Sequence, residues 1–229
     1  ADNARLARSS QVMPLSAYRK FYFDSIARDP NVVFHNAILY PDDFDTVRAV
    51  SFLTTAQPLT EPTRLVPVDL DYYFERGVLW MTSEMPGGKV FRTHVFDPLF
   101  FRSPLVEWRN YEASFDARSL EPASRAESTY VLQEYFVPVD KLEQFAPKMR
   151  AVLRKHAVNM INVSIRHAKK DPGTLLAWAR NDVFAFVLYY KQGTDKQARA
   201  QVGAWTRELI DASLSLGGTY YLPYQIHAT

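Results

Sequence analysis

The last hundred residues alternate between the two periodicities of regular structure, and this alternation constrains the fold more than any other feature. Apolar residues recur at every second position in β-rich stretches and at helical spacing between them. The predicted elements are, in order, a strand over Tyr130–Pro138, a helix over Val139–His156, strands over Met160–His167 and Val183–Tyr190, a helix over Asp195–Leu216 and a strand over Thr219–Leu222. This β-α-β-β-α-β order is typical of the ferredoxin-like unit. We therefore predict an α+β fold with such a unit at about residues 130–222.

The first part of the chain predicts further strands for the same sheet. A helix is expected around Leu15–Ala27, and strands are expected near Val32–Tyr40 and Thr46–Thr54. We expect these strands to extend the ferredoxin-like unit into one large antiparallel sheet with helices on one face.

The middle of the chain has a different character. Residues 56–128 are rich in Pro, Arg and aromatic residues and show only one short helical pattern, near Asp69–Met81. Such a segment is typical of a long excursion over one face of a domain. We therefore expect one domain over 1–229, with a helix and strands in 1–55, the excursion in 56–128 and the ferredoxin-like unit in 129–229.

Composition excludes several classes of function. The chain has 229 residues and no cysteine, which excludes disulfides, thiol nucleophiles and thiolate metal sites and leaves the compartment open between cytoplasm, periplasm and membrane periphery. Its 27 Lys and Arg against 25 Asp and Glu give a net charge of +2, too small to indicate a nucleic-acid partner. No apolar run approaches the roughly 18 residues that span a bilayer.

Known motifs are absent or incomplete. The stretch Asp182–Tyr189 fits the last six positions of the third strand of an RNA-recognition motif, but the basic residue and the glycine of that motif are missing. Core packing is therefore the favoured interpretation of this strand. The five histidines show no metal-ligand spacing, and no nucleophile elbow, P-loop or dinucleotide-binding glycine motif occurs. We expect no metal site.

One predicted strand carries polar side chains on one face. Apolar Ile161, Val163 and Ile165 alternate with Asn162, Ser164 and Arg166. A guanidinium on an interior strand needs an anionic or strongly accepting partner. Two partners are open: Glu134 on the first strand, as a structural ion pair, or an external ligand. The residues that would form the floor of a ligand pocket are Gln133, Glu134, Asn162, Ser164, Arg166 and Tyr224.

The sequence also resembles a known family. The stretches that carry the resemblance are V-L-Q-E-Y-F-V-P-V, I-N-V-S-I-R-H-A, A-R-N-D-V-F-A-F-V-L-Y-Y-K, W-T-R-E-L-I-D and G-G-T-Y-Y-L-P-Y-Q. They resemble the C-terminal substrate (cap) domain of FAD-dependent oxidases of the vanillyl-alcohol-oxidase type, particularly the sugar and alditol oxidases and decaprenylphosphoryl-ribose oxidase. V-V-F-H-N-A-I-L-Y-P and V-E-W-R-N-Y-E-A-S-F-D look like the same domain, so the resemblance covers nearly the whole chain.

The resemblance implies that the flavin and the substrate are bound by different domains. In this family FAD is held mainly by a separate N-terminal domain, which this sequence does not show, and the cap closes over the flavin ring and supplies the substrate pocket. The implied function is binding of an alcohol or sugar-like substrate for oxidation by FAD, with the chain's own FAD-binding domain as partner and no turnover by the isolated chain. The alternative is a non-catalytic ferredoxin-like module that binds a ligand or self-associates.

The resemblance also implies roles for single residues. Arg166 resembles an arginine beside the flavin that binds or polarises the substrate, and Tyr224 stands where several relatives carry a catalytic or positioning lysine. Ser164 stands where alditol oxidases have a glutamate, so the serine and the tyrosine depart from the family pattern. The implied catalytic residues are Arg166 and Tyr224, Arg166 also contacts the cofactor, and the implied substrate-binding residues are Glu134, Gln133, Asn162, Ser164 and Gln225.

The excursion offers one further interpretation. Its basic and aromatic side chains would suit contact with a membrane or with a lipid-linked substrate, as amphipathic surfaces do. Packing of these side chains onto the domain is the favoured interpretation, because their spacing shows no helical periodicity. The residues concerned are Arg92, Phe96, Phe100, Phe101, Arg102, Trp108 and Arg109.

Overall fold

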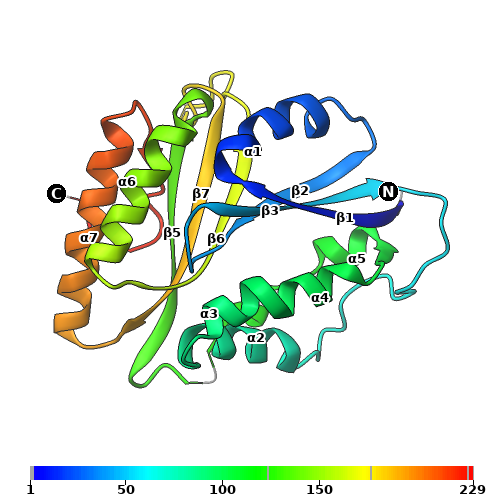
Figure 1. Cartoon of the computed structure of the whole chain (residues 1–229), viewed down its shortest axis with the longest axis horizontal. Helices are drawn as coiled ribbons and strands as arrows, with labels where there is room; N and C mark the ends of the chain where they lie inside the picture. Colours follow the sequence, from blue (N-terminus) through cyan, green and yellow to red (C-terminus); the bar gives the residue numbers. More distant parts are fainter. Residues whose placement is uncertain (1–2, 123, 176, 226, 229) are drawn as a thin grey trace. The chain divides into compact units, whose positions relative to one another are not determined.

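The strands form one eight-stranded sheet, in a computed structural model that describes residues 3–122, 124–175, 177–225 and 227–228. The strand order is β4-β1-β3-β2-β6-β7-β5-β8 (Figure 1). The strands are β1 (Arg5–Pro14), β2 (Val32–Leu39), β3 (Thr46–Thr54), β4 (Val106–Trp108), β5 (Ser128–Pro138), β6 (Asn159–Ala168), β7 (Val183–Gly193) and β8 (Thr219–Tyr220). The prediction of an α+β fold with a large antiparallel sheet is confirmed.

Helical segments connect these strands. The α-helices are α1 (Leu15–Phe21), α2 (Tyr73–Glu84), α3 (Gly88–Phe91), α4 (Asp97–Arg102), α5 (Arg109–Ala113), α6 (Leu142–Lys155) and α7 (Lys196–Leu214). Two π-helical turns continue α1 and α3, and two 3-10 turns precede β5 and α6: η1 (Tyr22–Ile26), η2 (Arg92–Phe96), η3 (Ala117–Leu120) and η4 (Val139–Lys141). The described chain contains no helix both long and apolar enough to cross a bilayer.

The chain divides into two compact units. The first consists of Ala1–Ala37 and Val47–Ala123, and the second of Ile38–Thr46 and Ser124–Thr229. The second unit runs β5-α6-β6-β7-α7-β8, which is the predicted order, and its strands lie in the order β6-β7-β5-β8. This arrangement puts the first and third strands of the ferredoxin-like unit side by side at its centre.

Apolar spacing and caps explain the two long helices of the second unit. Helix α6 buries Leu142, Phe145, Met149 and Leu153, at intervals of three or four residues that make one helical face. Asp195 caps α7 by accepting a hydrogen bond from the backbone N–H of Ala198 at 2.9 Å. The chain leaves α7 through Gly217, whose φ of 76° favours glycine.

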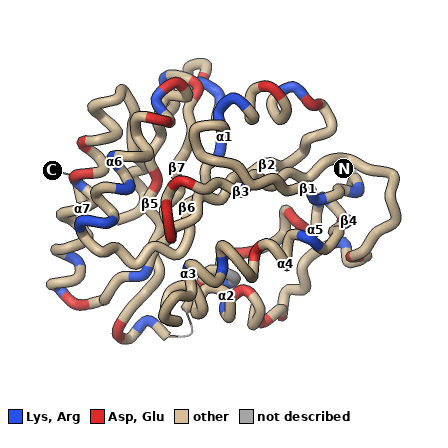
Figure 2. The backbone as a smooth tube through the Cα atoms, in the orientation of Figure 1, with Lys and Arg blue, Asp and Glu red and all other residues tan. Residues whose placement is uncertain are grey.

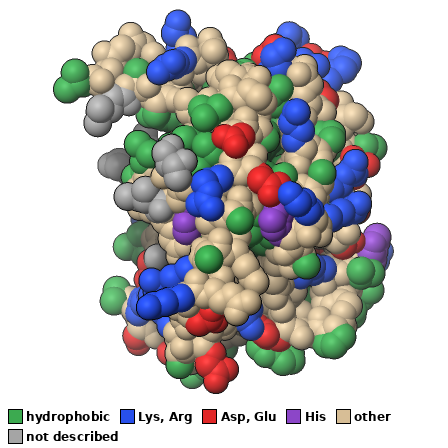
Figure 3. Space-filling model, turned by 90° about the vertical axis from the view of Figure 1, so that its left-hand side faces the viewer, with side chains coloured by type: hydrophobic (Ala, Val, Ile, Leu, Met, Phe, Trp, Pro, Cys, Tyr) green, Lys and Arg blue, Asp and Glu red, His purple; other side chains and the backbone are tan. Residues whose placement is uncertain are grey.

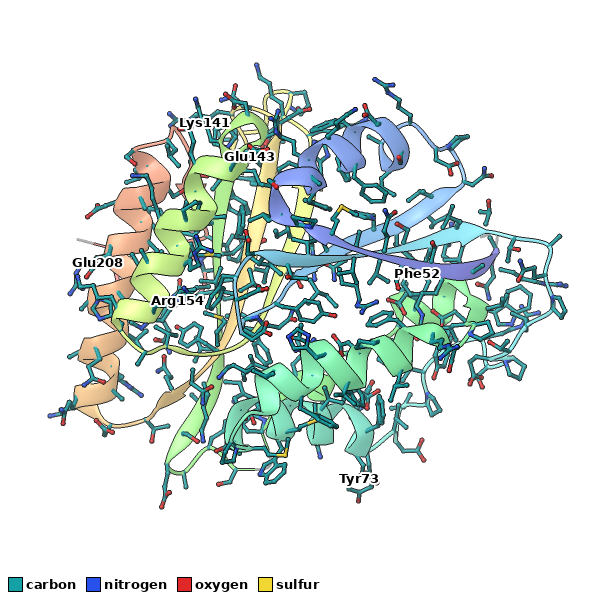
Figure 4. The ribbon with its side chains drawn as sticks, viewed as in Figure 1. Phe52, Tyr73, Lys141, Glu143, Arg154 and Glu208 are labelled. Carbon is teal, nitrogen blue, oxygen red and sulfur yellow. The ribbon has the colours of Figure 1, made fainter. Side chains whose placement is uncertain are left out.

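Helices α6 and α7 pack beside each other along the strands of the second unit, as Figure 1 shows. Glu208 on α7, labelled in Figure 4, accepts hydrogen bonds from Lys155 Nζ at 2.8 Å and from His156 Nε2 at 2.8 Å. On the side that Figure 3 shows, Lys and Arg lie among Asp and Glu, and Figure 2 shows residues of both signs scattered along the chain.

Strand register assigns the two faces of the sheet in the second unit. Tyr135 lies opposite Phe186, which lies opposite Ile165, and all three side chains are buried on the side of α6 and α7. One residue along, Glu134 lies opposite Val187, and Val187 lies opposite Ser164. Because directly opposed residues share a face, Glu134 and Ser164 lie on the face that α6 and α7 do not cover.

In the first unit, helices flank both faces of the sheet. Ser51 of β3 contacts His35, and His35 contacts Tyr18 of α1. Arg48, three residues earlier in β3 and therefore on the opposite face, lies with its guanidinium carbon 4.7 Å from the ring centroid of Phe101 in α4. The expectation of helices on one face thus describes α6 and α7 of the second unit, whereas in the first unit α1 and α4 lie on opposite faces of the sheet.

Two strands and most of the excursion's helices were not predicted. Strand β1 mixes charged, polar and apolar residues with an irregular burial pattern, and β4 has only three residues. Pairing with β4, in a register that sets Leu6 opposite Glu107, places β1 in the sheet. These elements depend on contacts between distant segments, which local periodicity does not reveal.

A pair of carboxyl groups lies near Arg8 in the first unit. Glu107 on β4 is 2% exposed, and Glu112 follows on α5. Burial and the neighbouring charge of Glu112 raise the pKa of Glu107 to about 8, while the guanidinium of Arg8 opposes this shift. Burial also raises the pKa of Glu112. At neutral pH the pair therefore holds a proton.

Protonation of His35 is expected to destabilise the protein in acid. Its Nε2 lies 3.1 Å from the Tyr18 hydroxyl and its Nδ1 lies 2.8 Å from Ser51 Oγ, and burial lowers its pKa from 6.5 to about 4. The folded state therefore binds fewer protons than the unfolded state between these pH values. The contribution of His35 to stability is complete above pH 6.5 and is lost as the pH falls towards 4. We expect a loss of about 2 kcal/mol, measured by urea unfolding. A His35→Gln variant should lose this part of the pH dependence, and an unchanged slope would contradict the assignment.

Candidate functional site

Three of the predicted site residues converge on one face of the sheet in the second unit, the face that α6 and α7 do not cover. Glu134 comes from β5, Arg166 from β6 and Tyr224 from the segment after β8. Glu134 and Tyr224 interact electrostatically with Arg166 and with each other. Glu134 and Arg166, 32 positions apart in the chain, are therefore brought to one face by the antiparallel pairing of β5, β7 and β6.

Arg166 is exposed, and its guanidinium is available to a ligand. Among the described residues it forms no hydrogen bond and no ion pair within 4.0 Å. The structural ion pair with Glu134, one of the two alternatives that the sequence left open, is therefore not formed. The reason is topological: β7 lies between β5 and β6, so the backbones of Glu134 and Arg166 are two strand spacings, about 10 Å, apart.

Glu134 is half-buried, and its carboxyl group makes no hydrogen bond to a described residue. Burial raises its pKa above the ordinary value, and the positive charge of Arg166 opposes this shift. A carboxylate whose pKa is raised binds a proton more strongly than an ordinary glutamate does. Glu134 is therefore better suited than an unperturbed carboxylate to accept a proton near neutral pH.

Tyr224 is suited to donate a hydrogen bond. Burial raises the pKa of its phenol, the negative charge of Glu134 adds to this effect, and Arg166 opposes it. A tyrosine base requires a lowered pKa, which is the opposite of the direction found. The phenol therefore keeps its proton at neutral pH and presents an O–H donor beside Glu134 and Arg166.

Asn162 and Ser164 continue the polar row of β6 on the same face. Asn162 Nδ2 donates to Ser164 Oγ at 3.2 Å, and Ser164 is buried. Between this row and Glu134 lie Val187 and Ala185 of β7, which are opposite Ser164 and Arg166 respectively. Both apolar side chains are buried, and they separate the polar groups of β6 from Glu134.

Two predicted substrate-binding residues lie elsewhere. Gln133 is 4% exposed and shares the helix-covered face with Tyr135, because adjacent residues of a strand point to opposite faces. Gln225 Oε1 lies 3.0 Å from His227 Nε2, and the backbone carbonyl of His227 accepts a hydrogen bond from Arg207 of α7. Within the described part of the chain, Gln225 makes no hydrogen bond to the polar groups of the site.

The donor set of this face fits a flavin ring. A planar, electron-rich ring needs hydrogen-bond donors at its edge. Arg166 offers guanidinium N–H groups, and Tyr224 offers a phenolic O–H. By contrast, the described residues include no cluster of three or more His, Asp or Glu side chains able to hold a metal ion.

Comparison with solved structures identifies the fold. A cholesterol oxidase from Brevibacterium sterolicum matches with a TM-score of 0.54 and 13% sequence identity, over 96% of this chain and 48% of that chain. A VAO-type flavoprotein from Myceliophthora thermophila C1 matches with a TM-score of 0.42 and 12% identity, over 99% of this chain and 41% of that chain. A berberine bridge enzyme matches with a TM-score of 0.48 and 9% identity, over 98% of this chain and 44% of that chain. No protein-family model matches the chain. No curated protein matches it either.

The chain thus has the fold of the part of cholesterol oxidase that it covers. The match to cholesterol oxidase confirms the expected resemblance to an oxidase at the level of fold. The chain spans about half the length of these solved structures or somewhat less. Identity of 13% or less carries no residue roles, so these depend on the geometry of the site itself.

Proposed function

We propose that this chain is the substrate-side cap domain of an FAD-dependent oxidoreductase that oxidises an alcohol or a sugar-like hydroxyl. The observation that supports the proposal most is the convergence of three polar groups, those of Glu134, Arg166 and Tyr224, on the sheet face that α6 and α7 do not cover, with no hydrogen bonds among them. Buried or half-buried polar groups are normally satisfied within the protein. Their arrangement is that of a site that a ligand completes.

Each group has a distinct role in the proposal. FAD, when bound by its own domain, supplies a two-electron acceptor for the hydride of the substrate C–H bond. Arg166 stabilises the negative charge that develops on the substrate oxygen, and Glu134 accepts the hydroxyl proton. Tyr224 donates a hydrogen bond that orients the substrate, with Asn162 and Ser164 beside it.

The FAD-binding domain is the proposed partner. The chain covers 48% of the cholesterol oxidase whose fold it shares, which leaves a part of similar length for the domain that holds the flavin. In this proposal the isolated chain does not turn over, because the electron acceptor is bound mainly by that domain. The visible absorption spectrum of the full natural gene product tests this: a flavin band supports the proposal. A colourless product that FAD does not reconstitute would instead favour the non-catalytic ligand-binding module.

Replacing Glu134 tests its role as proton acceptor. As the base must be deprotonated, kcat/KM should rise with pH through the raised pKa of Glu134. In Glu134→Gln we expect this acidic limb to disappear and kcat/KM at neutral pH to fall about a hundredfold. Glu143→Gln, in the first turn of α6 (Figure 4), is the matched control and should retain both. An acidic limb that persists in Glu134→Gln would assign the proton to another group.

A further inference from the structure

One helical segment of the first unit has its polar and apolar sides reversed. Helix α3, the π-helical turn η2 and helix α4 follow one another without a gap, so residues Gly88–Arg102 form one continuous helical segment. We call this segment the excursion helix. A helix at the surface of a globular protein normally turns its apolar residues towards the core and its polar residues towards water. The excursion helix does the opposite.

The inner side of the excursion helix is polar. Apart from Gly88, its buried residues are Arg92, Thr93 and Asp97. Arg92 Nε lies 3.5 Å from Asp97 Oδ2, which is an ion pair between two buried side chains. Thr93 Oγ1 donates a hydrogen bond to the carbonyl of Lys89 at 3.1 Å. Polar groups therefore occupy the side that faces the protein.

The outer side of the excursion helix is apolar. Phe91, Val95 and Leu99 are spaced four residues apart. The π-helical turn among them holds more residues than an α-helical turn, so this spacing keeps the three side chains on one side of the helix. The exposed large apolar side chains of the segment are Val90, Phe91, Val95, Leu99 and Phe100, and Leu99 is the most exposed at 62%.

Phenylalanine rings widen this apolar side. Phe74 on α2 is exposed, and its ring centroid lies 6.0 Å from that of Phe96 and 5.8 Å from that of Phe100. The rings of Phe96 and Phe100 stack with their centroids 5.9 Å apart. The three rings thus form one cluster that joins α2 to the excursion helix. We call Phe74 and the exposed apolar side chains of the excursion helix the outer surface.

The exposed charges near the outer surface are mainly basic. Within residues 85–111, both acidic residues, Asp97 and Glu107, are buried. His94 and Arg102, by contrast, are exposed. The outer surface therefore combines a broad apolar area with basic side chains of the same helix.

The two ends of the excursion helix differ in charge. Lys89, at its start, is partly exposed and interacts with Glu84 at the end of α2. That carboxylate offsets the positive charge at this end. The positive charge that an anionic partner would meet is therefore concentrated towards Arg102.

We infer that the outer surface binds an anionic lipid bilayer, with the excursion helix lying in the plane of the headgroups. Exposed apolar patches of this kind mark interaction sites, and helices that lie in the interface combine an apolar side with basic residues. The apolar side chains reach the acyl chains below the headgroups, while Arg102 pairs with lipid phosphates. A protein partner fits less well, because protein interfaces have polar rims with hydrogen-bonding groups. The inference does not depend on the proposed function, since none of its residues belongs to the candidate site.

Flotation of the full natural protein with lipid vesicles tests the inference. One set of vesicles contains phosphatidylcholine alone, and the other contains phosphatidylcholine mixed with phosphatidylglycerol. We expect binding to the anionic vesicles that weakens as the salt concentration rises, because salt screens the charges. Leu99→Glu should weaken this binding about tenfold or more, because it puts a charge into the apolar side. Arg102→Gln should weaken it about fivefold, which is the factor typical of one basic residue near an anionic membrane.

Leu214→Glu is the matched control for Leu99→Glu. Leu214 is 50% exposed at the end of α7 in the second unit, so the variant adds the same charge at a similarly exposed leucine. It should bind anionic vesicles as the unsubstituted protein does. Circular dichroism and thermal unfolding establish that each variant is folded. If Leu99→Glu does not fold, Arg102→Gln alone decides the test.

Three outcomes would overturn the inference. If Leu99→Glu and Leu214→Glu weaken vesicle binding equally, or neither weakens it, the membrane contact lies elsewhere on the protein. Equal binding to both kinds of vesicle without an effect of salt would remove the role of anionic lipid. Absence of binding to either kind would leave a protein as the occupant of the outer surface, and dissociation of a dimer in Leu99→Glu would identify that protein as a second copy of the chain.

Discussion

Replacing Arg166 by alanine is expected to slow reduction of the flavin by substrate about a hundredfold in the protein that carries both domains. The guanidinium would stabilise the negative charge developing on the substrate oxygen, and removal of one such preorganised donor typically costs two to three orders of magnitude, or about 3 kcal/mol. Arg166 is exposed and makes no hydrogen bond or ion pair with a described residue. Its loss should therefore leave the free energy of unfolding unchanged within about 0.5 kcal/mol.

Two variants sharpen this test. Arg166→Lys keeps the charge but loses the planar donor fork, so we expect an intermediate rate. Arg199→Ala removes an exposed arginine from α7, which covers the opposite face of the sheet in this unit, and should reduce flavin at the unaltered rate. Unchanged reduction kinetics in Arg166→Ala would remove Arg166 from the mechanism. Loss of folding would instead show that its contribution is structural.

Replacing Glu107 by glutamine is expected to stabilise the protein at alkaline pH. Burial and Glu112 raise the pKa of Glu107 from 4.5 to about 8, so the folded state binds more protons than the unfolded state between these values. The contribution of Glu107 to stability is therefore complete below about pH 4.5 and is lost as the pH rises to about 8. This contribution is lost because the folded protein must give up the proton of a buried carboxyl group.

Glutamine at position 107 resembles the protonated carboxyl group and cannot ionise. Its amide can donate to Glu112, so urea unfolding at pH 5 should be nearly unchanged while stability at pH 8.5 rises by a few kcal/mol. The groups that face Glu107 and enter this balance are Arg8 on β1, Glu112 on α5 and Glu61. Glu127→Gln, at an exposed position before β5, is the matched control. A variant with the same pH slope as the unsubstituted protein would show that Glu107 is ionised in the fold.

The sequence predicted the second unit well because its local signals agree with its tertiary contacts. Each of its signals lies within a few residues of sequence: alternating apolar residues in the strands, the helix cap at Asp195 and the helix end at Gly217. The structure has the predicted order of elements. The first unit was less predictable. Strand β1 lies between β3 and β4 in the sheet, and its own residues show no clean alternation.

The part of the site that could be predicted is the part that follows from the alternation of side chains between the two faces of a strand. Alternation placed Asn162, Ser164 and Arg166 on one face, as the structure has them. The same alternation shows that Gln133 and Glu134 must point to opposite faces, yet only the register of β5 against β7 decides which of them joins Arg166.

The most direct test of the proposed function is anaerobic titration of the flavin-containing full natural protein with a panel of alcohols. The panel should include primary, cyclic and sugar alcohols, and the signal is the visible flavin absorbance. Hydride transfer from a substrate C–H bond predicts bleaching by at least one of them, retained in Arg199→Ala and slowed in Arg166→Ala. A flavin that dithionite reduces but that no alcohol reduces would contradict the assignment of this chain to alcohol oxidation.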